Sequence, residues 1–185
     1  MNSDGETYRV KIGGIQRELP LVEVAPGVRI AVFNILGDTE LVEACAQGMQ
    51  IKLQDIAFDL LVTAEAKSIP LIHALSSRMR KPYIVLRKAY KIYMGHAIEA
   101  ETLSITTGKP QKLFLDEKDH ELADGKRIVL IDDVISTGST LAGMRKVMEM
   151  AGSEVVAEAA VYTEGDAEKW KEIIALGHLP LFMDD

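Results

Sequence analysis

The chain has 185 residues, of which 48% are hydrophobic, and its formal net charge is −7 at pH 7. This length and composition fit one domain with a substantial core, expected over residues 1–185. The negative charge argues against a basic nucleic-acid-binding face, so we expect no nucleic-acid partner. No apolar run approaches the roughly 18 residues of a membrane span, and the N-terminal residues lack signal-peptide features, so no membrane partner is expected. The single cysteine, Cys45, is expected to be buried, which favours a cytoplasmic protein.

The first part of the chain predicts short strands. Residues 7–33 alternate loosely between apolar and polar side chains, with glycine and proline at the turns. We expect residues 1–36 to form a small hood, with its last strand at 28–33, before a core of residues 37–185.

A helix is predicted to follow the hood. Asp38 or Thr39 suits its N-cap, and Gly48 is expected to weaken its end. Its apolar face carries Leu41, Val42, Cys45 and Met49.

The remaining elements alternate. After the first helix we expect a strand at 58–63, a helix capped by Ser68, strands at 83–86 and 128–131, a helix at 141–148, a strand at 155–161 and a final helix at 166–176. Alternating strands and helices favour an α/β fold, with a parallel sheet flanked by helices. Ligands in such sheets bind beyond the carboxyl ends of the strands. The loops after Thr63, Leu86 and Ile131 leave three such ends.

Residues 87–125 form the least regular stretch, although 102–106 and 112–115 read as hairpin segments. Long excursions of this kind in compact domains are usually functional, so we expect a mobile loop over this range.

Residues 127–140 carry the strongest functional signal. A buried strand runs into Asp132 and Asp133, and a helix follows a small, hydroxylated loop. The loop residues are Ser136, Thr137, Gly138, Ser139 and Thr140. The first turn of a helix offers unpaired N–H groups and a positive dipole end, which suit a phosphate. Two adjacent carboxylates can accept hydrogen bonds from vicinal ribose hydroxyls, so the pattern indicates a phosphorylated sugar. The competing interpretation is a set of ordinary turn and N-cap residues.

This order of strand, two acids and phosphate loop resembles the phosphoribosyl-pyrophosphate signature of the type I phosphoribosyltransferases. The resemblance implies a parallel sheet flanked by helices, with a small N-terminal hood and a long flexible loop. It implies Mg²⁺-dependent transfer of a 5-phosphoribosyl group from phosphoribosyl pyrophosphate to a purine base, and a homodimer. Asp132 and Asp133 would be catalytic and would hold the metal indirectly, through water and substrate.

Two further segments are similar to motifs of that family. Glu65, Ala66, Lys67 and Ser68 resemble its pyrophosphate loop, where backbone amides meet the leaving group. Arg87, Lys88 and Lys91 resemble the basic opening of its flexible loop, with Arg87 and Lys88 in catalytic roles and Lys91 binding substrate. Taken without the resemblance, these segments read as a capped helix start and an exposed basic turn.

For the base, the resemblance points to the hood and to the loops after Phe33 and Tyr162. Phe33 or Tyr162 would stack on a purine and Asn34 would read its edge. Adenine phosphoribosyltransferases carry a glutamate in the mobile segment, whereas the comparable residues 104–108 here contain none. Adenine is the first expectation, with xanthine or hypoxanthine/guanine next. A non-catalytic sensor of phosphoribosyl pyrophosphate is the alternative from another class.

Overall fold

The chain forms a five-stranded parallel sheet that carries the site. A computed structural model describes residues 5–103 and 110–183. The strand order is β10, β9, β8, β4, β5, and every neighbouring pair is parallel. Their bounds are β4 (Leu60–Ala64), β5 (Tyr83–Leu86), β8 (Arg127–Ile135), β9 (Glu154–Glu164) and β10 (Ile174–Leu179). The predicted α/β class is therefore confirmed, and the carboxyl ends of β4, β5 and β8 lie at one edge.

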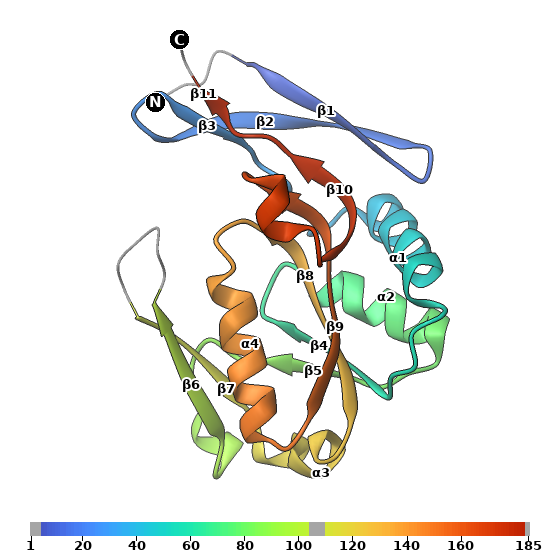
Figure 1. The fold of residues 1–185 in the computed structure, drawn as a ribbon, viewed down its shortest axis with the longest axis vertical. Helices are drawn as coiled ribbons and strands as arrows, with labels where there is room; N and C mark the ends of the chain where they lie inside the picture. Colours follow the sequence, from blue (N-terminus) through green and yellow to red (C-terminus); the bar gives the residue numbers. More distant parts are fainter. Residues whose placement is uncertain (1–4, 104–109, 184–185) are drawn as a thin grey trace.

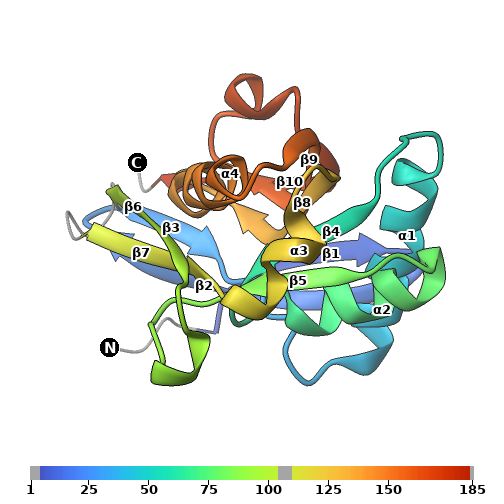
Figure 2. The same ribbon diagram turned by 90° about the horizontal axis from the view of Figure 1, so that it is seen from below.

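Helices cover both faces of this sheet (Figure 2). Helices α1 (Thr39–Leu53) and α2 (Ile69–Met79) pack in one hydrophobic cluster with β4, β8 and β9. Helix α4 (Ser139–Met150) packs in a second cluster on the other face. Strand β4 is buried at every position, which explains why it reads as a continuous apolar run rather than an alternating one. Cys45 is fully buried in α1, as predicted.

A separate antiparallel sheet lies over the carboxyl edge of the main sheet (Figure 1). We call this sheet the hood. Its strands, in spatial order, are β1 (Thr7–Ile12), β2 (Ile15–Ala25), β3 (Val28–Ala31) and β11 (Phe182–Met183). The last of these follows β10, so the chain leaves the main sheet to complete the hood.

An ion pair joins the hood to the start of α1. Arg17 on β2 donates two hydrogen bonds to the Asp38 carboxylate, at 2.7 and 3.0 Å. The same carboxylate caps the helix by accepting from the Leu41 amide, at 3.1 Å, so Asp38 is the predicted N-cap. The Arg17 guanidinium holds the pKa of Asp38 below its usual value. One side chain therefore fixes both the helix start and the hood above it.

The stretch after β5 is more regular than predicted. It contains 3₁₀ turns at Ile92–Met94 and Glu117–Asp119, an antiparallel hairpin of β6 (Ile98–Leu103) and β7 (Pro110–Leu115), and the short helix α3 (His120–Ala123). The hairpin packs against α4 in the second core cluster, through Ala100, Leu113 and Leu115. Residues 104–109, which include part of the predicted hairpin and the segment compared with the adenine enzymes, lie outside the described residues. The mobility of 87–125 stays a prediction.

The prediction of a final helix was wrong. The final helix, expected at 166–176, is a 3₁₀ turn (Ala167–Trp170) followed by strand β10. This segment is a strand because it pairs in parallel with β9. The pairing is close, since a Cβ added at Gly177 would lie 2.6 Å from the Tyr162 ring. Gly48, which was expected to weaken the end of the first helix, lies inside α1, and the helix continues to Leu53. A Cβ at Gly48 would lie 3.2 Å from the Leu176 side chain of β10, so the missing side chain leaves room for this strand to pack against α1.

Strand β8 is also longer than predicted. It continues through Asp132 and Asp133 to Ile135, so the two acids lie within the strand and not after it. No helix among the described residues is long and apolar enough to cross a membrane.

Candidate active site

Two adjoining cavities lie where β8 meets the hood and α4. The larger, of about 330 Å³, extends from the hood-side residues Ile30 to Phe33 to the phosphate loop, which we define as residues 136–140. The smaller, of about 240 Å³, lies over residues 64–68 at the end of β4. The two share the lining residues Lys67, Asp132, Asp133, Val134 and Thr140. A ligand with two anionic ends can therefore span both cavities across the acid pair.

The acid pair is organised by Ser68. The Ser68 hydroxyl donates to Asp132 Oδ1 at 2.9 Å and accepts from the Asp133 amide at 3.1 Å. That amide also donates to Asp132 Oδ1, at 2.9 Å. Ser68 holds the N-cap position of α2, as predicted, but its side chain does not cap the helix. Its hydroxyl instead ties the start of α2 to the Asp132 carboxylate and the Asp133 main chain.

Burial and the neighbouring Asp133 charge raise the pKa of the Asp132 carboxyl to about 7. Desolvation disfavours the ionised form, and a second carboxylate disfavours it further. Asp132 is therefore a far weaker acid than an exposed aspartate. Donors or a cation brought by a ligand would favour its ionised form.

The phosphate loop has the geometry of an anion site. Gly138 is the N-cap of α4 and adopts a left-handed conformation with φ +83°. The loop hydroxyls of Thr137 and Ser139 lie 3.1 Å apart and line the larger cavity, as do all five loop residues. The N–H groups of the first helical turn face the same region, where the helix dipole favours negative charge.

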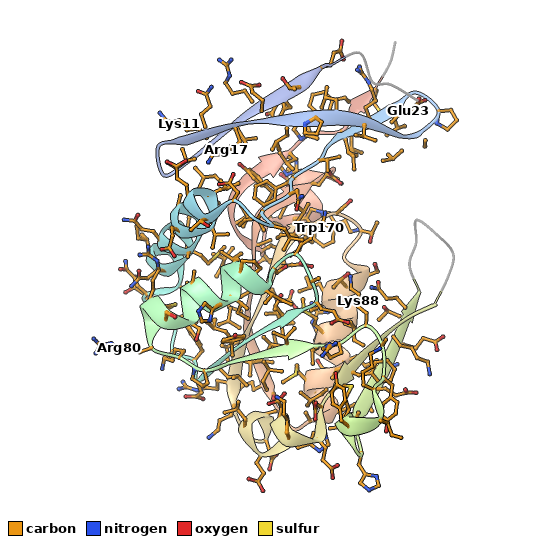
Figure 3. The ribbon with its side chains drawn as sticks, turned by 180° about the vertical axis from the view of Figure 1, so that it is seen from behind. Lys11, Arg17, Glu23, Arg80, Lys88 and Trp170 are labelled. Atoms are coloured by element: carbon orange, nitrogen blue, oxygen red, sulfur yellow. The ribbon has the colours of Figure 1, made fainter. Side chains whose placement is uncertain are left out.

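A short segment after β9 supports this loop from outside. The Trp170 ring packs so closely on Gly138 that a Cβ there would lie 2.6 Å from ring atom Cη2. The indole N–H donates to the Glu164 carbonyl at 3.1 Å, and Lys169 Nζ donates to the Thr137 carbonyl at 3.2 Å. The Trp170 ring lies between the hood and α4 (Figure 3).

The predicted pyrophosphate-side residues divide into two groups. Glu65, Ala66, Lys67, Ser68 and Lys88 line the smaller cavity. Arg87 lines neither cavity of the site; its Nε donates to the Glu65 carboxylate at 2.5 Å. The same carboxylate accepts from the Lys88 amide at 2.7 Å. Glu65 thus holds the main chain at Lys88 by one hydrogen bond and forms an ion pair with the Arg87 side chain.

The predicted base-side residues also divide. Phe33 lines the larger cavity, but only 2% of it is exposed and its ring packs edge-on against Tyr162, with centroids 5.1 Å apart. Asn34 accepts a hydrogen bond from the Leu36 amide and lines neither cavity. Lys91 is exposed and likewise lies outside both. The cavity wall instead includes Ile30, Val32 and Glu164, none of which was predicted.

The acid pair suits a metal carried by the substrate. Within the described residues, no group of three or more His, Cys, Asp or Glu side chains gathers to hold an ion. Asp132 and Asp133 therefore offer a pair of carboxylates and not a closed cage. Mg²⁺ often binds through one or two carboxylates, with water and substrate phosphates completing its shell. The donor set at the junction of the cavities fits that mode.

Comparisons with known proteins identify the family. The phosphoribosyl transferase domain family matches residues 34–177. The hypoxanthine/guanine phosphoribosyltransferase of Methanococcus voltae is 32% identical over 151 residues, covering 81% of this chain and 73% of that protein. The adenine phosphoribosyltransferase of Thermosipho africanus is 30% identical over 151 residues, covering 78% of this chain and 85% of that protein.

Solved structures agree in fold. The crystal structure of the adenine phosphoribosyltransferase from Thermoanaerobacter pseudethanolicus has a TM-score of 0.68, at 20% identity, over 94% of this chain and 95% of that chain. The Giardia lamblia enzyme complexed with 9-deazaadenine has a TM-score of 0.66, at 18% identity, over 78% of this chain and 82% of that chain. Together with the cavities at the ends of β4 and β8, these matches show that the chain belongs to the phosphoribosyltransferase family and is an enzyme of type I fold.

Proposed function

We propose that this enzyme transfers the 5-phosphoribosyl group of phosphoribosyl pyrophosphate to a purine base, with adenine as the first candidate. The observation that carries the proposal is the pair of joined cavities with Asp132 and Asp133 where they meet. One cavity ends in a helix N-terminus and the other in lysines, so a sugar with anions at both ends fits across them. Xanthine remains a candidate base. Hypoxanthine/guanine is the strongest rival acceptor because the relatives include such enzymes.

The phosphate loop would bind the 5′-phosphate through the amides of α4 and the Thr137 and Ser139 hydroxyls. Asp132 and Asp133 would accept hydrogen bonds from the ribose hydroxyls and fix the ring between the cavities. Ser68 would keep the acid pair in place through its hydrogen bonds to the Asp132 carboxylate and the Asp133 main chain. Holding both ends of the sugar fixes its anomeric carbon relative to an incoming base, which replaces an encounter in solution by a bound geometry.

The smaller cavity would bind the pyrophosphate. Lys67 and Lys88 line it, and the amides at Ala66 and Lys67 belong to the turn between β4 and α2. When bound, Mg²⁺ would neutralise charge on the departing pyrophosphate, and Asp132 and Asp133 would hold it through water and substrate oxygens. The reaction would form a bond from a purine nitrogen to the anomeric carbon and break the bond to pyrophosphate. The base would lose the proton on that nitrogen.

Arg87 would reach the smaller cavity only by leaving Glu65. Closure of the segment after β5 over the site would exclude water while the anomeric carbon carries cationic character. The homodimer and the cytoplasmic location remain predictions, based on the family resemblance and on the single buried cysteine.

The test is pyrophosphate release from phosphoribosyl pyrophosphate and Mg²⁺ with each base in turn: adenine, hypoxanthine, guanine, xanthine and orotate. We expect release with adenine. Release with orotate alone would refute the purine assignment. Tight binding of phosphoribosyl pyrophosphate with no turnover of any base would instead indicate the sensor.

A further inference from the structure

The larger cavity contains a third carboxylate that the proposed chemistry does not use. Glu164 is the last residue of β9 and is 6% exposed. It lines the larger cavity and not the smaller one, whereas Asp132 and Asp133 line both. This acid is therefore placed away from the pyrophosphate side.

The main chain fixes the direction of this side chain. Residues two apart on a strand share a face, so Glu164 points to the same side as Tyr162. The Tyr162 ring contacts Phe33, at the hood side of the cavity. The Trp170 indole N–H also holds the Glu164 carbonyl, at 3.1 Å. The carboxylate is thus presented from a rigid strand end.

The Glu164 carboxylate has no fixed donor in the part of the chain that the structure describes. No hydrogen bond or ion pair reaches it within residues 5–103 and 110–183, unlike the acid pair, which bonds Ser68. The carboxylate oxygens are not among the buried atoms of the described residues that lack a hydrogen-bond partner, so they face the accessible space of the cavity. A ligand that fills the cavity displaces water from them, which is costly unless the ligand supplies a hydrogen bond. An ionised carboxylate is an acceptor only, so what it lacks is a donor. A ligand that fills the cavity has to bring one.

The groups on the two substrates differ in whether they can donate a hydrogen bond to the Glu164 carboxylate. Phosphate groups carry negative charge and would be repelled by this acid. In the proposed function the ribose hydroxyls donate to the acid pair at the junction. Only the base remains, and purines differ in the donors on their edges. Adenine carries an amino donor at position 6, where hypoxanthine carries a carbonyl acceptor.

We propose that Glu164 is a specificity-determining residue that accepts a hydrogen bond from the 6-amino group of adenine. The inference rests on the proposed function and gives a physical basis for adenine as the base that accepts the phosphoribosyl group. A 6-oxo purine in the same position would set its carbonyl oxygen against the carboxylate. Neither the hydrogen bond to adenine nor the repulsion of a 6-oxo purine requires a glutamate in residues 104–108.

The test compares adenine with hypoxanthine, because the two bases differ at position 6. We expect the wild type to favour adenine in kcat/KM. Glu164→Gln should lower kcat/KM for adenine by about 10- to 100-fold, the value of a hydrogen bond to a charged group. The kcat/KM for hypoxanthine should stay or rise, because the glutamine amide can donate to a 6-oxo group. The KM for phosphoribosyl pyrophosphate should not change.

Glu154→Gln is the matched control, since this exposed glutamate begins the same strand. It should alter no kinetic constant. Glu164→Gln should unfold at about the same temperature as the wild type, because the carboxylate faces the cavity and no hydrogen bond or ion pair among the described residues depends on it. A lower unfolding temperature would mean that the carboxylate has a structural partner, and would overturn the inference.

The kinetic outcomes separate the two proposals. If no purine releases pyrophosphate with the wild type, the proposed function fails. If adenine is turned over and Glu164→Gln leaves its kcat/KM unchanged, the function stands and the role of Glu164 fails. A loss confined to guanine would place the carboxylate at the 2-amino edge and would also overturn the adenine assignment.

Discussion

Replacing Gly138 with alanine should test how tightly the phosphate loop is built. Gly138 adopts φ +83°, and an added Cβ would meet Trp170 Cη2 at 2.6 Å and Cζ3 at 3.3 Å. The ring cannot swing away freely, because its N–H bonds the Glu164 carbonyl. The substitution therefore combines an unfavourable backbone conformation with a collision.

The two effects can be estimated separately. A left-handed backbone costs about 1–2 kcal/mol for a residue with a Cβ. Overpacking costs about 1–3 kcal/mol, so together the free energy of unfolding should fall by about 2–5 kcal/mol. In a chain of this length each kcal/mol shifts the unfolding temperature by about 2–4 °C, which gives a fall of about 4–20 °C.

Gly125→Ala supplies the control in the same assay. Gly125 has φ +66°, and nothing lies within 4 Å of an added Cβ, so this variant carries the backbone cost alone. Thermal unfolding followed by circular dichroism should show Gly138→Ala melting below Gly125→Ala. Equal unfolding temperatures would refute the collision with Trp170. An unchanged temperature in both variants would refute the backbone argument as well.

Three further predictions follow from the acid pair, the hood contact and the cysteine. Asp133→Ala should abolish most pyrophosphate release while circular dichroism shows an intact fold; full activity would contradict a role for Asp133 in holding ribose. Asp38→Asn keeps a capping oxygen but loses the charge bound by Arg17. Since the folded state lowers the pKa of Asp38, the wild type should be more stable than the variant above the unfolded pKa of about 3.9, and the difference should vanish as pH falls through the folded value. Thermal melts across this range check the sign, and a difference that grows on acidification would contradict it. Burial, with the Asp38 charge adding to it, raises the pKa of the Cys45 thiol to about 12, so the folded protein should react with iodoacetamide only after denaturation.

The central motif could be predicted because its signal is local. Residues 127–140 carry the strand, the acids, the loop and the helix start in one continuous run, and each has its own sequence pattern. The structure keeps that order and adds only length to β8. The five loop residues and both acids gather around one cavity.

The missed features depend on segments far apart in the chain. Ser68 has the pattern of an N-cap, yet its hydroxyl bonds an acid 64 residues away. Arg87 reads as a free cation in the sequence, but in the structure it forms an ion pair with Glu65. Glu164 looks like an ordinary residue at the end of a strand until the hood closes the cavity above it. Residues 166–176 fit a helical period, and only pairing with β9 shows that residues 174–176 belong to a strand.

The crossing of the chain from β10 to β11 constrains the order in which the molecule can be assembled. During synthesis the strands around the acid pair emerge well before Phe182 and Met183, which pair with β3. The acid pair and the phosphate loop are therefore synthesised while the β3 edge of the hood is still unpaired. Under the proposed function, the sugar-binding side of the site would be complete before the hood sheet above the larger cavity.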